Sequence, residues 1–258
     1  MKTINASITT WLLLVTCFVS FDVKAKQIAI VIDDIGYHQR DLEFLTLPGQ
    51  LSYSILPHTP YSQAFASLAS QSNKELLLHV PMQALNGKKL GPGALTLSMS
   101  KEQLQQTLGT ALASLPQVKG VNNHMGSALT QHSQAMKWTM EVLKKRHLYF
   151  LDSRTTDLSQ AQNAANFLGV ANISRQVFLD NIITPEQLQL RFDELKQQAT
   201  DHNFAIAIAH PYPETIDFLR EALPQLIDQG FELVPVSQLV ERKYIQLAQA
   251  EGKGVSAR

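Results

Sequence analysis

The chain has 258 residues, 45% of them hydrophobic and 7% aromatic, and its 22 basic residues balance its 22 acidic ones. Balanced charge gives no broad attraction to nucleic acid or to anionic lipid, so neither is expected as a partner. The residues that follow the first 25 suffice for one large α/β domain with its own core. The single cysteine, Cys17, offers no intramolecular disulfide.

Residues 1–25 have the pattern of a cleavable signal peptide. Lys2 gives a positive start, an apolar run extends from Ile8 to Phe21, and Val23-Lys24-Ala25 fits a cleavage site. The run is shorter than the roughly 20 residues of a membrane span, which disfavours an uncleaved anchor and stable membrane insertion. Thr16 before Cys17 makes a poor lipoprotein signal. We therefore expect cleavage after Ala25 and a periplasmic or secreted protein.

The stretch Gln27 to Gly36, QIAIVIDDIG, joins an unbroken apolar run to two carboxylates and a glycine. Such a run is typical of a parallel strand buried on both faces, with Asp33 and Asp34 at its carboxyl end. Successive strand side chains point to opposite faces, so the two carboxylates can converge only where the strand turns, at Ile35-Gly36. In the alternative, one aspartate caps the following helix and the other is solvated.

Strands and helices are predicted to alternate along the rest of the chain. Further strands are expected at 51–56, 75–80, 119–121, 147–152, 176–180, 204–209 and 231–236. Helices are expected at 39–47, at 60–70 with Ala64, Leu68 and Phe65 as candidate inward residues, from Ser100 with a stripe of Leu104, Leu108, Leu112 and Leu115, at 133–146 and 161–168, from Thr184 with Leu188, Phe192, Leu195 and Ala199 buried, at 213–229, and from 237 onward.

This alternation of seven or eight units predicts a single α/β domain, a distorted (β/α) barrel over residues 26–240, ahead of an open sheet. A polar C-terminal tail is expected at 241–258. The long connection 81–99 is typical of a binding loop.

Six ionisable residues fall just after apolar strand runs: Asp33, Asp34, His79, His124, Asp152 and His210. In a barrel these strand ends meet at one mouth, where the six would form a polar cluster. Any one of these histidines could instead simply bond a nearby carbonyl. One carboxylate and two neutral imidazoles suit Zn²⁺ and leave a position for water, while a second carboxylate can accept a proton. This is the equipment of a metal-dependent hydrolase.

Five motifs resemble a known family: IDDIG at 32–36, LLLHVPMQ at 76–83, NNHMGS at 122–127, FLDSRT at 150–155 and IAIAHPYP at 206–213. Together they resemble the divergent branch of the polysaccharide deacetylases, carbohydrate esterases that remove acetyl groups from N-acetylated sugars on a distorted (β/α) barrel. The resemblance implies that Asp33 is the general base, Asp34 a metal ligand and His210 the general acid.

The sequence departs from the main deacetylase pattern at two places. The usual H-x-x-x-H is replaced by His79 followed four residues later by Gln83, so His124 is the substitute ligand and the role of Gln83 stays open. The main family's arginine motif is absent, and Arg154 is the candidate replacement. Asp152 is expected to orient His210.

The leading functional hypothesis is an exported zinc-dependent deacetylase of a polysaccharide or peptidoglycan-type glycan. A metal-bearing, non-catalytic envelope protein that binds a glycan or a protein is the alternative, and a metal-dependent hydrolase of another ester or amide is a third. The low aromatic content, with Trp138 as the single tryptophan after residue 25, argues against a long glycan substrate.

Overall fold

The computed structural model describes residues 25–255. The predicted signal peptide lies outside these residues except for Ala25. Among the helices that are described, none is long and apolar enough to cross a membrane.

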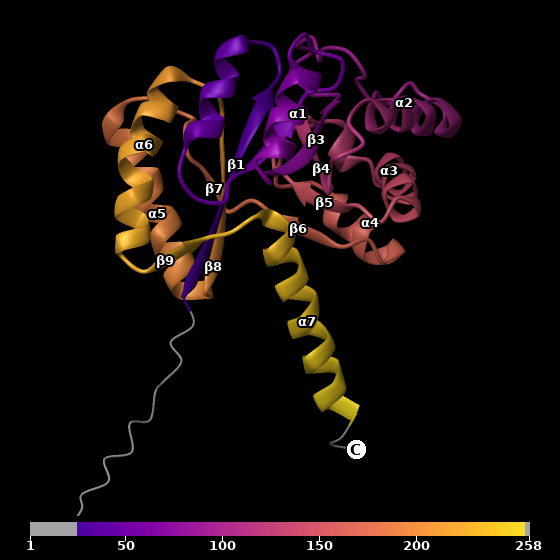
Figure 1. Ribbon diagram of the computed structural model, residues 1–258. Coiled ribbons are helices and arrows are strands. Elements are labelled where there is room, and N and C mark those ends of the chain that lie inside the picture. Colours follow the sequence, from indigo (N-terminus) through magenta and orange to yellow (C-terminus); the bar gives the residue numbers. More distant parts are fainter. Residues whose placement is uncertain (1–24, 256–258) are drawn as a thin grey trace, which may run out of the picture.

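One curled parallel sheet forms the centre of the molecule (Figure 1). Its strands are β1 Lys26–Ile35, β2 Ser52–Ile55, β3 Glu75–Met82, β4 Gly120–Met125, β5 Tyr149–Asp152, β6 Asn172–Ser174, β7 Val177–Phe178, β8 Phe204–Ala209 and β9 Phe231–Leu233. Their order is β6-β5-β4-β3-β2-β1-β8-β7, with β9 also paired to β1. Every pairing is parallel, so all the strands end at the same edge of the sheet.

Helices follow the strands and cover the outside of the sheet. They are η1 Gln39–Thr46, α1 Ser62–Gln71, α2 Lys101–Ser114, η2 Leu129–Gln131, α3 Ser133–Lys145, α4 Ala161–Leu168, α5 Pro185–His202, α6 Pro213–Asp228 and α7 Val236–Val255. In Figure 1, α2, α3 and α4 lie toward one side of the sheet and α5 and α6 toward the other, while α7 points away from the body. Residues 241–255 of the expected polar tail thus belong to this last helix.

The distorted (β/α) barrel expected from the sequence is confirmed. The ordered path of strands begins at β6 and ends at β7, and only residues 175 and 176 separate these two strands in the chain. The sheet is therefore a half-barrel whose two ends are joined by a very short connection. The sequence predicted one strand at 176–180, whereas the chain forms two short ones, β6 and β7, on opposite ends of the path.

Alternation along the strands divides the core into two layers. On β1, Ile28, Ile30 and Ile32 belong to a large cluster that includes the apolar stripes of the covering helices. Ala29 and Val31 belong to a smaller cluster made of strand residues, Val234 and the first turns of α7. Because side chains alternate between the faces of a strand, the first series faces the helices and the second fills the barrel. We call these directions outward and inward.

The predicted apolar stripes of α2 and α5 are confirmed, and the Ser100–Gln103 capping box is present. The inward face predicted for α1 is confirmed for Phe65 and is wrong for Ala64 and Leu68, which are exposed. Phe65, Ala66 and Ala69 are buried there, whereas Leu68 is 43% exposed. This short helix carries apolar residues on several faces, and the large Phe65 ring, 5.3 Å from the ring of Tyr53, meets the sheet.

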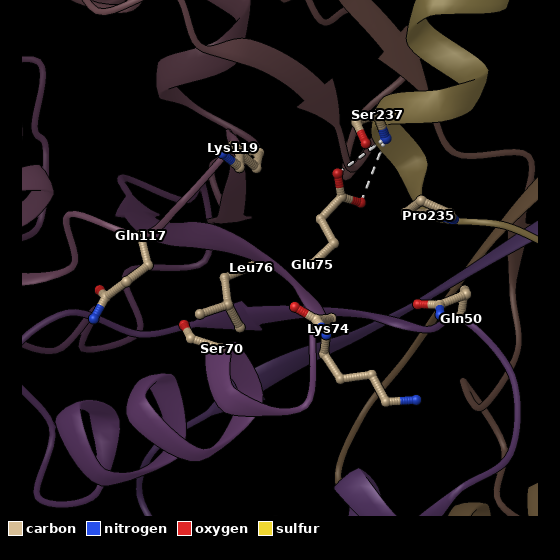
Figure 2. A pocket seen from close by; sticks show the side chains of 10 residues that line it. Gln50, Ser70, Lys74, Glu75, Leu76, Gln117, Lys119, Pro235 and Ser237 are labelled. Atoms are coloured by element: carbon tan, nitrogen blue, oxygen red, sulfur yellow. Dashed lines mark hydrogen bonds between the residues drawn. The ribbon is translucent and has the colours of Figure 1, made fainter.

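A cavity of about 330 Å³ lies at the end of the barrel where the strands begin (Figure 2). Glu75 stands at its edge and accepts hydrogen bonds from Ser52 Oγ, at 2.6 Å, and from the backbone N–H of Ser237 at the start of α7. Lys74 Nζ donates to the carbonyl of Gly49. Glu75 thus joins the start of α7 to the strand beginnings, and Lys74 holds the loop before β2.

Candidate metal centre at the barrel mouth

Both aspartates lie near the carboxyl end of β1, at the barrel mouth, which is the edge at which the strands end. Asp33 continues the inward series of Ala29 and Val31 and is 2% exposed. Asp34 has a φ of 58°, which breaks the alternation and lets its side chain turn toward the same region. Asp41 Oδ2 fixes this turn by accepting hydrogen bonds from the N–H groups of Gly36 and His38.

Two histidines from neighbouring strands meet Asp34. His79 lies inward on β3, and its Nε2 is 3.1 Å from Asp34 Oδ1. His124 lies inward on β4, and its Nδ1 is 2.7 Å from the same oxygen. One ligand atom from each of the three residues lies within 4.8 Å of the others. The structure therefore gathers the three residues that the sequence proposed as metal ligands.

The chemistry of this group fits a divalent cation. His79 Nδ1 lies 2.7 Å from the amide oxygen of Asn122, which can only accept, so in the neutral ring Nδ1 carries the proton and Nε2 offers a lone pair. Asp34 Oδ1 is buried and receives no hydrogen bond of acceptable geometry. A carboxylate oxygen without a donor, faced by two imidazole nitrogens, suits Zn²⁺.

The electrostatics of the two aspartates differ. Burial raises the pKa of Asp33, against the charges of His79 and His210, which act to lower it. Burial would also raise the pKa of Asp34, but its close approach to His124 and His79 outweighs this effect and holds the pKa well below its usual range. Asp34 is therefore kept anionic, as a metal ligand must be. Asp33, whose Oδ1 accepts from Asn122 Nδ2 at 2.8 Å, has the greater basicity of the two.

His210 follows β8, where it continues the inward series of Ile206 and Ile208. Its Nδ1 lies 2.8 Å from Asp180 Oδ1, and the other oxygen of Asp180 accepts from the His210 N–H and from Thr215 Oγ1. Burial lowers the pKa of His210, but the hydrogen bond and charge of Asp180 prevail and raise it to about 9. With Nδ1 bonded to Asp180, the Nε2 of this ring is the nitrogen left to hold a transferable proton.

The expectation that Asp152 orients His210 is wrong, because Asp180 makes this contact. Tyr149 and Leu151 of β5 face inward, so Asp152 shares the outward face with Phe150. Its carboxylate accepts from the Arg154 N–H and from Ser159 Oγ, and so holds the loop after β5.

Arg154 and Gln83 also have local contacts. The guanidinium of Arg154 lies 3.8 Å from the exposed Asp157. Arg175 is the arginine fixed at the strand ends, since it donates to the carbonyls of Ser153 and Arg154 and covers the Phe178 ring at 3.8 Å. Gln83 Oε1 accepts from the Leu97 N–H, which anchors the long loop after β3.

Sequence reasoning missed three polar residues of this region: Asn122, Arg175 and Asp180. Two of them carried a signal. Asn122 directly follows the predicted strand 119–121, and Asp180 ends the predicted strand 176–180 in the same way that Asp33 ends the apolar run 28–32.

A family model for divergent polysaccharide deacetylases matches residues 30–240. The chain therefore belongs to the divergent polysaccharide deacetylase family. Its fold is that of the carbohydrate deacetylases, an α/β distorted barrel.

The chain is also similar to individual proteins, among them the following three. An uncharacterized protein of Haemophilus influenzae is 37% identical over 223 residues, which cover 86% of this chain and 79% of that protein. The crystal structure of an uncharacterized protein from Agrobacterium tumefaciens C58 is similar with a TM-score of 0.81 at 23% identity, covering 84% of this chain and 90% of the other. A CE4 family pseudoenzyme from Bacillus anthracis is similar with a TM-score of 0.52 at 16% identity, covering 84% and 66%.

Proposed function

We propose that this protein is an exported zinc-dependent deacetylase that removes acetyl groups from an N-acetylated amino-sugar polymer. Family membership supports a glycan substrate. The observation that carries the proposal is the convergence of Asp34, His79 and His124 beside the buried carboxylate of Asp33. This arrangement gives a metal ligand set and a separate base at one barrel mouth.

The roles of the residues follow from their contacts. Asp34, His79 and His124 hold the ion, which when bound supplies Lewis-acid activation of water and of the acyl carbonyl. Asp33 accepts a proton from the attacking water, because its raised pKa favours proton uptake and its Oδ2 receives no hydrogen bond from Asn122. His210 donates the proton on Nε2 to the departing amine nitrogen, while Asp180 holds the ring through Nδ1.

The alternative is a metal-bearing protein that binds a glycan without cleaving it. The likeness to a pseudoenzyme of the CE4 family keeps this alternative in the test, and a mutant of that pseudoenzyme is described as having restored enzymatic activity. The two functions share the fold and the metal site. They differ in whether Asp33 acts as a general base.

The test measures zinc content and acetate release in parallel. Purified protein without residues 1–25 is assayed on peptidoglycan and on chitin oligomers, beside Asp33→Asn and His124→Ala. We expect about one zinc per chain in the wild type and in Asp33→Asn, and loss of tight binding in His124→Ala. Asp33→Asn keeps the size and most hydrogen bonds but not the basicity, so acetate release should fall by about 10² to 10⁴.

Two results would contradict the proposal. If His124→Ala keeps stoichiometric zinc at unchanged affinity, the ligand set is wrong. If the wild type binds zinc and glycan but releases no acetate from any N-acetylated polymer, the non-catalytic function replaces the enzymatic one.

A further inference from the structure

Asn122 lies between the candidate metal site and the candidate base. It is fully buried on β4 and faces inward. Its Oδ1 accepts from His79 Nδ1 at 2.7 Å and from Ser54 Oγ. Its Nδ2 donates to Asp33 Oδ1 at 2.8 Å and lies 3.3 Å from Ser153 Oγ. One amide thus contacts both a metal-ligand histidine and the carboxylate beside it.

The hydrogen-bond partners permit only one orientation of this amide. A carboxylate accepts and cannot donate, so the amide edge that faces Asp33 must be the NH₂ group. The carbonyl oxygen must then face His79, and it can only accept, which places the proton of the neutral imidazole on Nδ1. A flipped amide would set its oxygen against the carboxylate and leave the buried Asp33 Oδ1 without this donor, at a cost of about 1 to 3 kcal/mol.

We propose that Asn122 is a positioning residue that ties the metal-binding tautomer of His79 to the orientation of Asp33. This inference rests on the proposed function and adds a residue to it. Partners behind a metal-ligating histidine fix its tautomer and ring orientation, and their loss commonly weakens metal affinity by about 10- to 100-fold. Here the same partner also holds Oδ1 of Asp33, which leaves Oδ2, 3.6 Å from His79 Nε2, directed toward the metal site.

Two substitutions at this position separate positioning from simple packing. Asn122→Ala removes the acceptor for His79 and the donor for Asp33. Asn122→Asp keeps an acceptor for His79 but turns a second carboxylate oxygen toward Asp33. We therefore expect zinc affinity to fall by about 10- to 100-fold in Asn122→Ala and to stay within about threefold of wild type in Asn122→Asp.

Acetate release provides the second measurement. With zinc saturating, kcat of Asn122→Asp should fall at least about tenfold while KM changes less than about threefold, because the added charge disturbs Asp33 and not the binding surface. A side chain that only filled space would not give this split between a kept metal affinity and a lost kcat.

Asn172→Ala is the matched control. Asn172 is also a fully buried asparagine of the same sheet, on β6, and its Nδ2 donates to Asn166, to the Val170 carbonyl and to Tyr244. Its loss should lower the melting temperature, as a lost buried network does, yet leave zinc affinity within about threefold of wild type.

Zinc affinity, measured by competition with a chelator, is decisive because it needs no turnover. Equal affinities of Asn122→Ala and wild type would overturn the proposal, as would an equal loss in Asn122→Asp and Asn122→Ala. If the wild type binds zinc but releases no acetate, the proposed function fails and the affinity pattern still decides the role of Asn122. A wild type that binds no zinc overturns both.

Discussion

His210 and Asp180 form the best-defined ion pair at the barrel mouth. Asp180 is held by three donors, from His210 Nδ1, the His210 N–H and Thr215 Oγ1. The ring of His210 also lies 6.1 Å from the stacked ring of Phe178, which Arg175 covers. A histidine fixed on several sides keeps its Nε2 aimed in one direction, which general-acid catalysis requires.

This pair predicts a pH-dependent contribution to stability in the metal-free protein. The pKa of His210 rises from an ordinary value of 6.5 to about 9 on folding. The contribution is therefore fully present below about pH 6.5 and is lost as the pH rises through about 9. Asp180→Asn removes the main cause of the rise, so the wild type should exceed this variant in melting temperature by more at pH 6 than at pH 9.5.

Thermal unfolding at the two pH values measures the difference. The gap should widen by at least about 2 °C, or about 1 kcal/mol, toward pH 6. Asp217→Asn is the control, since Asp217 is exposed and pairs only with Arg220 in a surface i,i+3 contact. An identical wild-type advantage over Asp180→Asn at both pH values would contradict the assignment.

At the scale of elements, the turn between β1 and η1 decides where the two aspartates point. Gly36 has a φ of 125°, and a Cβ there would collide with Thr59 Oγ1. Its N–H donates to Asp41, and its carbonyl accepts from the Tyr61 N–H. The glycine therefore permits both the turn and its close packing against the segment before α1.

Gly36→Ala should damage both stability and the metal site. A backbone conformation that L-residues avoid costs about 1 to 3 kcal/mol, and the collision adds to it. Gly87→Ala is the matched control, because Gly87 has a φ of 66° but no atom within 4 Å of its added Cβ. We expect Gly36→Ala to be the more destabilised by at least about 1 kcal/mol in urea unfolding and to bind zinc at least about tenfold more weakly. Equal unfolding free energies and equal zinc affinities of the two variants would contradict this role of the turn.

At the scale of the whole molecule, the two ends of the barrel have different tasks. At the mouth, Asp33, Asp34, His79 and His124 contact side chains from other strands. The opposite end holds the start of β1, the buried Glu75 and the beginning of α7, which projects from that end in Figure 1. Strand carboxyl ends support variable, chemically active loops, whereas the other end serves stability.

Export is the prediction that belongs to this scale. β1 begins at Lys26, directly after the proposed cleavage site, so cleavage after Ala25 would leave every strand of the sheet intact. N-terminal sequencing of protein from the periplasmic fraction should read Lys26 as the first residue. A protein that starts at Met1 and stays with the membrane fraction would show that the segment is not cleaved.

The sequence by itself determined which strands carry Asp33, Asp34, His79, His124 and His210, although β3 and β4 run on to Met82 and Met125, beyond their predicted ends. Asp33, His79 and His210 follow apolar runs, and a run of that length bounded by polar residues is by itself typical of a buried parallel strand. The apolar stripes of α2 and α5 were equally readable, since both helices have a capping signal and a regular spacing. The five family motifs are likewise short, continuous stretches that can be recognised without knowledge of the tertiary structure.

Only the tertiary structure decided which polar residues meet. Asn122 bonds Asp33 across 89 residues and Asp180 bonds His210 across 30, and neither separation is encoded in a local pattern. The sequence also left open to which face of the sheet a side chain points. Asp152 and Asp33 both follow apolar runs, yet Asp152 points outward and Asp33 points inward. The physical reason is that strand alternation fixes relative parity within a strand, whereas the direction of the first residue depends on how neighbouring strands and helices pack.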